Sequence, residues 1–168
     1  MIHRIRKEDF ESSGLYEQIG KDLHIIIPSK FELREKVEDL WEGHTMIPPF
    51  PFVEGEEVTV KIFKMTYYRA SLAQSRNFIK SLNGYLGGPW VLALGLLSFK
   101  EHLLKKENLL KKKYLISVDE KSRLQKDGIG HRVPVLNILN SGTCVPHFIY
   151  LKEKYEIMEQ ILIVVVPR

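Results

Sequence analysis

The C-terminal stretch ILIVVV, Ile161 to Val166, decides the predicted fold. All six residues are apolar, so the stretch has no polar side that could face water. A strand of this kind is buried on both faces, and it must lie inside a sheet that other elements cover from both sides. We therefore predict that Ile161–Val166 is a central strand.

Five further segments are predicted to form strands. Three lie between residue 113 and the C-terminal stretch, with the sequences KYLISV, VPVLNIL and CVPHFIYL. DLHIIIP, Asp22 to Pro28, is rich in isoleucine and is expected to be a buried strand. EVTVKIFKMTYY, Glu57 to Tyr68, shows the clearest alternation of apolar and polar residues.

Two helices are predicted from caps and apolar spacing. Ser29 stands three residues before Glu32, which is the spacing of a capping box. Four apolar residues then share one helix face, and this pattern predicts a helix from Ser29 to Trp41: Leu33, Val37, Leu40 and Trp41. SLAQSRNFIKSLNG is predicted to form the second helix, which stops at Asn83-Gly84.

The segment that follows has two interpretations. Leucine and alanine outnumber β-branched residues after Trp90, which favours a helix from Pro89 to about Lys106 whose first half is buried nearly all round. The alternative is a strand up to Leu97 and a new helix from Ser98, capped with Glu101. With either choice, the order of elements predicts an α+β fold. We expect one domain, residues 1–168, with a mixed or mostly antiparallel sheet of about five to six strands and about three helices.

The proline-rich stretch MIPPFPF, Met46 to Phe52, is incompatible with regular structure. We expect an extended loop that packs its phenylalanines on the core. The alternative is that a groove on a partner protein recognises it as a proline-rich ligand.

Composition narrows the class of protein. The chain is 44% hydrophobic and 27% charged, as in soluble globular proteins, and no apolar run approaches the length of about 20 residues that spans a membrane. The N-terminus lacks the apolar region of a signal peptide, and the single Cys144 indicates a reducing compartment, so we expect a cytoplasmic protein without membrane contact.

Positive charge gives only a weak indication of a partner. The net charge is +4, and the lysines of Lys105–Lys113 would lie on several sides of a helix rather than along one groove. No zinc-finger, recognition-helix or RNA-binding motif is present. We expect weak attraction to nucleic acid at most, and the oligomeric state is left open.

The segment KDGIGHRVP contains the main candidate for chemistry. Asp127, His131 and Arg132 lie within six residues, and two glycines separate Asp127 from His131. We predict an exposed loop at Asp127–Arg132 in which Asp127 orients His131 as a general base and Arg132 binds an anion. A plain turn between two strands is the alternative.

Three further positions join this hypothesis. Arg69 and the glycine pair Gly87-Gly88, before the predicted Pro89 helix, are candidates for binding a phosphate or carboxylate. His147 is a candidate catalytic residue. It follows Cys144 by three residues, and we expect Cys144 itself to be a buried structural residue.

Two functions are therefore predicted. The first is a small enzyme or ligand-binding protein for an anionic small molecule. The second is a non-catalytic module that binds a protein or nucleic acid. The chain contains neither a Walker A loop nor a dinucleotide-binding fingerprint, and we expect neither a cofactor nor a metal.

Overall fold

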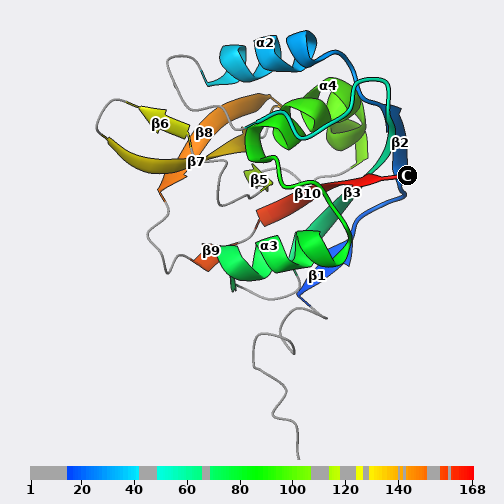
Figure 1. Ribbon diagram of the computed structural model, residues 1–168. Coiled ribbons are helices and arrows are strands. Elements are labelled where there is room, and N and C mark those ends of the chain that lie inside the picture. Colours follow the sequence, from blue (N-terminus) through cyan, green and yellow to red (C-terminus); the bar gives the residue numbers. More distant parts are fainter. Residues whose placement is uncertain are drawn as a thin grey trace, which may run out of the picture.

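The computed structural model of the chain describes residues 15–41, 49–65, 69–106, 114–117, 124–126, 129–139, 141, 143–150, 156–158 and 160–168. The helices in this part of the chain are α2 (Lys30–Leu40), α3 (Leu72–Ser81) and α4 (Gly88–Lys106). The main sheet contains β1 (Tyr16–Gln18), β2 (Leu23–Ile26), β3 (Glu57–Met65), β5 (Tyr114–Ile116), β6 (Leu124–Lys126), β7 (Ile129–Ile138), β8 (Cys144–Tyr150) and β10 (Gln160–Pro167). A separate two-stranded sheet consists of β4 (Arg69–Ser71) and β9 (Glu156–Met158). The predicted α+β class is confirmed (Figure 1).

The main sheet is six positions wide, although it contains eight described strands. β1 and β2 lie end to end along one edge of β3, because β10 occupies the other edge. In the same way β5 and β6 share one edge of β7, opposite β8. The pairs of described strands are antiparallel except for β5 with β10, which is parallel. This is the mixed, mostly antiparallel sheet that the sequence predicts.

Strand β10 is an inner strand of this sheet, as predicted. β3 pairs with one of its edges and β5 with the other. Its side chains alternate between two cores: Ile161, Ile163 and Val165 pack on the side of α4, and Leu162 and Val164 pack on the side of α3. All of them are buried, which explains why this strand carries no polar side.

Helix α4 lies between α2 and the sheet, as Figure 1 shows. It begins at Gly88 and continues without a break to Lys106, so the continuous helix is confirmed and the strand-plus-helix alternative is wrong. Its residues are buried from Gly88 to Leu96 because one side packs on the sheet and the other packs under α2. The Ser29 side chain caps α2 by accepting a hydrogen bond from the Glu32 N–H at 3.2 Å, as its spacing predicts.

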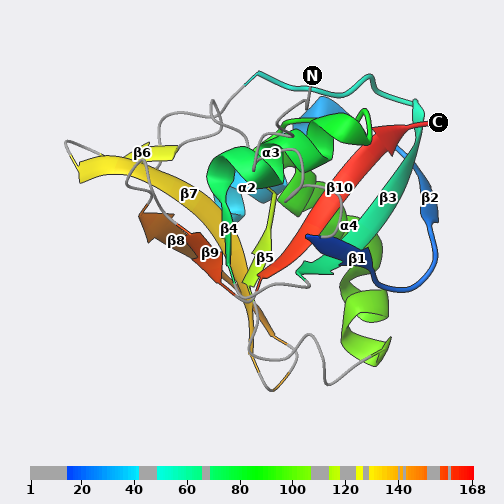
Figure 2. The ribbon, with the colours of Figure 1, turned by 90° about the horizontal axis from the view of Figure 1, so that it is seen from below.

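Helix α3 covers the opposite face of the sheet: it lies below β10 in Figure 1, and on the near side of the sheet in Figure 2, which is seen from below. Phe78 and Ile79 of α3 pack on that face, and the helix stops at Asn83, which has a positive φ of 55°. At Gly84, an added Cβ would lie 2.7 Å from Cγ1 of Val164 and 2.9 Å from Cγ2 of Ile79. Glycine is therefore needed there to let the chain pass close to β10.

Strand β2 forms, but it is not the buried strand predicted for Asp22–Pro28. Among the described strands only β3 pairs with it, so it lies at the edge of the sheet. Leu23 and Ile25 are partly buried, whereas His24 and Ile26 are exposed. The sequence could not reveal this difference, because the exposure of an apolar strand depends on which strands lie beside it.

The β1–β2 edge is interrupted between its two strands. Ile19 still donates its N–H to the Ile62 carbonyl at 2.7 Å, but pairing to β3 resumes only at Leu23. The Asp22 carboxylate accepts hydrogen bonds from Lys61 Nζ at 2.7 Å and Gln18 Nε2 at 2.6 Å, and these bonds lower the pKa of Asp22. Short, broken strands with charged side chains are a usual way to protect a sheet edge from pairing with another chain.

The described end of the proline-rich stretch, residues 49–52, forms an irregular loop, as predicted. Phe52 is buried, and Phe50 packs edge-on against Trp90 with 5.1 Å between ring centroids. The rest of this stretch, residues 46–48, lies outside the described residues.

Candidate functional site

The predicted loop Asp127–Arg132 is wrong from Ile129 onward, which is four of its six residues. Ile129–Arg132 belongs to β7, which pairs with β6 so that His131 lies opposite Gln125 and Arg132 lies opposite Leu124. β6 and β7 are antiparallel neighbours that Asp127-Gly128 separate in the sequence. Asp-Gly between two strands is a sequence signal of a hairpin, and a plain turn between two strands was the alternative interpretation. Asp127 and Gly128 lie outside the described residues, as do the side chains of His131 and Arg132.

His147 lies on β8, next to the strand that carries His131. Its register partner is Val135, four residues along β7 from His131. The two histidines are therefore offset by about 13 Å along the strands, at about 3.3 Å per residue. The His147 side chain is exposed, and its carbonyl accepts a hydrogen bond from Trp41 Nε1 at 3.3 Å. A catalytic role for His131, Asp127 and His147 stays a prediction.

The remaining predicted site residues lie in other parts of the fold. Arg69 is on β4, opposite Met158, and its side chain is not among those described. Gly87 and Gly88 are buried at the start of α4. A Cβ added at Gly87 would lie 2.6 Å from Cγ of Pro51, so the glycine allows the loop of residues 49–56 to pack on α4. Anion binding by these three residues also stays a prediction.

Cys144 begins β8, where it lies opposite Ile138. Its side chain is outside the described set, so its predicted burial stays a prediction. The part of the chain that is described holds no group of three or more His, Cys, Asp or Glu side chains arranged to bind a metal.

A different feature stands out among the described side chains. Three large apolar residues are each about two-thirds exposed: Ile26 at 65%, Val53 at 66% and Phe31 at 69%. They come from the end of β2, the first turn of α2 and the loop of residues 49–56. We name these three residues the junction surface, because the three segments meet there.

Backbone hydrogen bonds hold the three segments together. The Ile27 N–H donates to the Glu56 carbonyl, and the Gly55 N–H donates to the Ile27 carbonyl, both at 2.9 Å. The Lys30 N–H, in the first turn of α2, donates to the Glu54 carboxylate at 2.7 Å. The backbone that carries the junction surface is therefore ordered by hydrogen bonds between its segments.

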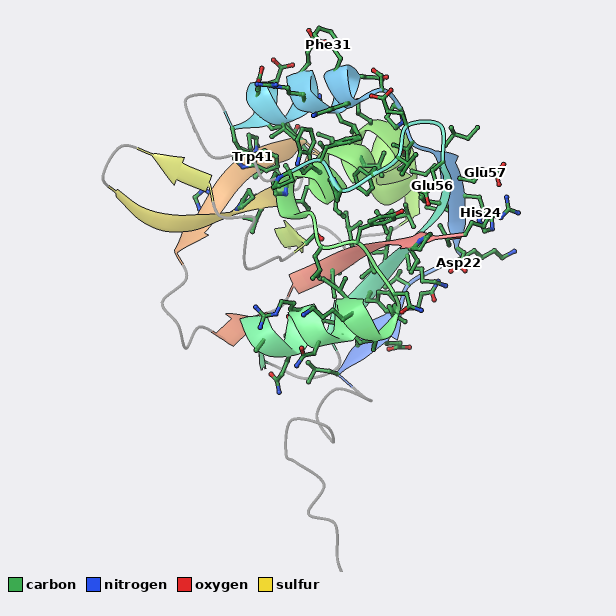
Figure 3. All side chains as sticks on the ribbon, viewed as in Figure 1. Asp22, His24, Phe31, Trp41, Glu56 and Glu57 are labelled. Carbon is green, nitrogen blue, oxygen red and sulfur yellow. The ribbon has the colours of Figure 1, made fainter. Side chains whose placement is uncertain are left out.

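Phe31 is exposed because of its place on α2. Figure 3 shows Phe31 on the outer side of α2, pointing away from the body of the molecule. Leu33 and Val37 form the buried face of the helix. Phe31 stands two residues before Leu33, which is about 200° around the helix. This apolar residue opposite the buried face is a signal in the sequence that the prediction missed.

Comparisons with known proteins add no further assignment: no family model, no curated protein and no solved structure matches the chain. None of the helices in the described residues has both the length and the apolar character needed to cross a membrane.

Proposed function

We propose that the protein is an interaction module that binds an apolar segment of a partner protein through the junction surface. The observation that carries the proposal is the exposure of Ile26, Phe31 and Val53, at 65–69%, on a junction held by backbone hydrogen bonds. Single exposed apolar residues are ordinary on protein surfaces. Here the three most exposed large apolar side chains among the described residues come from three segments that are hydrogen-bonded to one another, and this grouping supports the proposal.

The size of the expected affinity follows from the exposed area. Full burial of a large apolar side chain contributes about 1.5–3 kcal/mol, so burying the exposed two-thirds of each residue contributes about 1–2 kcal/mol. The burial energy of three such residues offsets part of the translational and rotational entropy that is lost when two molecules associate. We therefore expect a transient complex with a Kd between about 1 μM and about 1 mM.

The fixed backbone favours binding. Ser29 and Glu54 both cap the first turn of α2, and the loop of residues 53–56 is bonded to Ile27. A surface that is already ordered loses little conformational entropy when a partner binds, so more of the burial energy appears as affinity.

Selection from a displayed library of random peptides tests the proposal. The bait is the wild-type protein, and each selected peptide is then measured against the triple variant Ile26→Ser, Phe31→Ser, Val53→Ser. The matched control is Leu97→Ser, Leu139→Ser, Val145→Ser, which removes three apolar residues that are exposed by 38–42% elsewhere on the molecule. We expect peptides that bind the wild type and the control but lose about tenfold or more in affinity on the junction variant. Peptides that bind all three proteins equally would contradict the proposal.

A further inference from the structure

We infer that the partner segment that binds the junction surface is basic, with lysine or arginine beside its apolar residues. This inference rests on the proposed function and names the chemistry of the partner. It starts from the distribution of charge along the chain. Residues 1–57 contain 7 Lys and Arg against 13 Asp and Glu, whereas residues 58–168 contain 18 against 8. The junction surface belongs to the acidic part, although the whole chain has a charge of +4.

Exposed carboxylates flank two of the three apolar residues, Phe31 and Val53, and outnumber the one exposed cation directly beside Phe31, Lys30. Glu32 and Glu35 follow Phe31 on α2, and Glu54 follows Val53 in the loop; all three are exposed. On the helix surface, Arg34 and Glu35 are the neighbours of Phe31 one turn later, and Arg34 is already paired with Glu38. A partner that covers Phe31 must therefore place its own side chains near the carboxylate of Glu35.

The carboxylates of the two helix residues are available to a partner. Among the described residues, the structure gives the side chains of Glu32 and Glu35 no ion pair or hydrogen bond. By contrast, nearby acidic residues already have cationic partners: Glu38 pairs with Arg34 at 2.9 Å, and Glu57 pairs with Arg168. Negative charge that is left uncompensated beside an apolar surface attracts a cationic partner and repels an anionic one.

Two synthetic peptides of equal length test the inference. One combines leucine with lysine at helical spacing, and the other has glutamate in place of every lysine. We expect the wild type to bind the lysine peptide about tenfold or more tightly than the glutamate peptide in about 50 mM NaCl. The difference should shrink in about 500 mM NaCl, since salt screens exposed charges.

A matched pair of double variants locates the effect. Glu32→Gln with Glu35→Gln should weaken binding of the lysine peptide by about fivefold. Glu17→Gln with Asp39→Asn removes the same charge from β1 and from the last turn of α2, and it should change the affinity by less than about twofold. All four substitutions are at exposed positions and leave the apolar residues in place, and the exposed Glu17–Lys64 ion pair that the control removes contributes little to stability, so neither double variant is expected to unfold the protein.

Failure of the inference can be told apart from failure of the proposed function. If both peptides bind the wild type equally and the junction triple variant binds neither, the docking function stands and the basic partner is wrong. If the triple variant binds the lysine peptide as the wild type does, the docking function itself is wrong. The inference is also overturned if the lysine peptide does not bind the wild type at about 1 mM.

Sedimentation velocity tests whether the partner is a second copy of this chain. If the wild type is a dimer and the junction triple variant is a monomer, the junction surface binds another copy of the chain, and the inference of a basic partner segment is wrong.

Discussion

The protein places the same three residue types in two opposite environments. In the sheet, Ile163, Val164 and Phe63 are exposed by 0%, 0% and 6%. At the junction of β2, α2 and the loop, Ile26, Val53 and Phe31 are exposed by 65%, 66% and 69%. The first set lies between helices on both faces of the sheet, and the second lies where no described element covers it.

This difference separates residues that the fold requires from residues that it does not. Burial of Ile163 and Val164 on β10 contributes to folding, because their area is removed from water when the sheet is covered. Ile26 and Val53 keep most of their area in water, so folding gains little from them. Covering of these exposed side chains by a partner is the basis of the proposed interaction.

The largest expected effect comes from one substitution made in both environments. Val164→Asp places an unpaired carboxylate between β10 and α3, which costs several kcal/mol out of a total stability of roughly 5–15 kcal/mol. We expect this variant to lack a cooperative unfolding transition at about 25 °C. Circular dichroism during urea titration measures the result.

Val53→Asp is the control for that experiment. The same substitution at this exposed position should change the free energy of unfolding by no more than about 0.5 kcal/mol. A folded, cooperative Val164→Asp protein would mean that β10 is peripheral in solution. A Val53→Asp protein that unfolds would mean that the junction surface is covered within the monomer.

The elements that the sequence predicted well are those with local signals. β10 was predicted from six consecutive apolar residues, and the start of α2 was predicted from Ser29 and Glu32. Both could be predicted because a strand buried on both faces and a helix cap each depend on a few neighbouring residues. The exposure of β2 was mispredicted because it depends on pairing between residues distant in sequence. The pairing of β6 with β7 was not predicted, because the segment from Asp127 to Arg132 was interpreted first as a ligand loop and only alternatively as a turn between two strands.

An intermediate effect is expected at Gly84, which packs against the Val164 side chain of β10. Gly84→Ala would place a methyl group 2.7 Å from Cγ1 of Val164, so a neighbour must move. We expect a loss of about 1–3 kcal/mol in the free energy of unfolding, as for other overpacked cores. Urea denaturation of the single variant and of Gly84→Ala combined with Val164→Ala measures it.

The double variant gives the prediction its specificity. Val164→Ala removes the atom nearest to the new methyl group, so Gly84→Ala should cost less in that background than in the wild type. Equal costs in the two backgrounds would mean that the clash with β10 does not determine the need for glycine.

The candidate site was less predictable than the fold. Phe31 could have been noticed from its position about 200° away from Leu33 on the helix. Ile26 and Val53 could not, since both lie in apolar stretches and only the folded chain shows that they stay exposed. The predicted site residues that are described, by contrast, are distributed over β4, β7, β8 and the start of α4. The sequence does not show which of these segments pair with one another, so it could not show whether their residues meet.

The smallest effect is expected from substitutions that remove a single methyl group in each environment. Ile163→Val leaves a gap between β10 and α4, and such a change costs about 0.5–1.5 kcal/mol in a packed core. Ile26→Val removes the same group from a side chain that is 65% exposed, and it should change the free energy of unfolding by less than about 0.5 kcal/mol. Paired urea titrations with equal m-values are needed to resolve the two changes in the free energy of unfolding.

An equal cost at both positions would mean that Ile26 is packed in solution, and the junction surface would then lose one of its three residues. A difference confined to Ile163 would instead show that the fold does not depend on the size of Ile26, so any loss of peptide binding in Ile26→Val must come from the contact with the peptide.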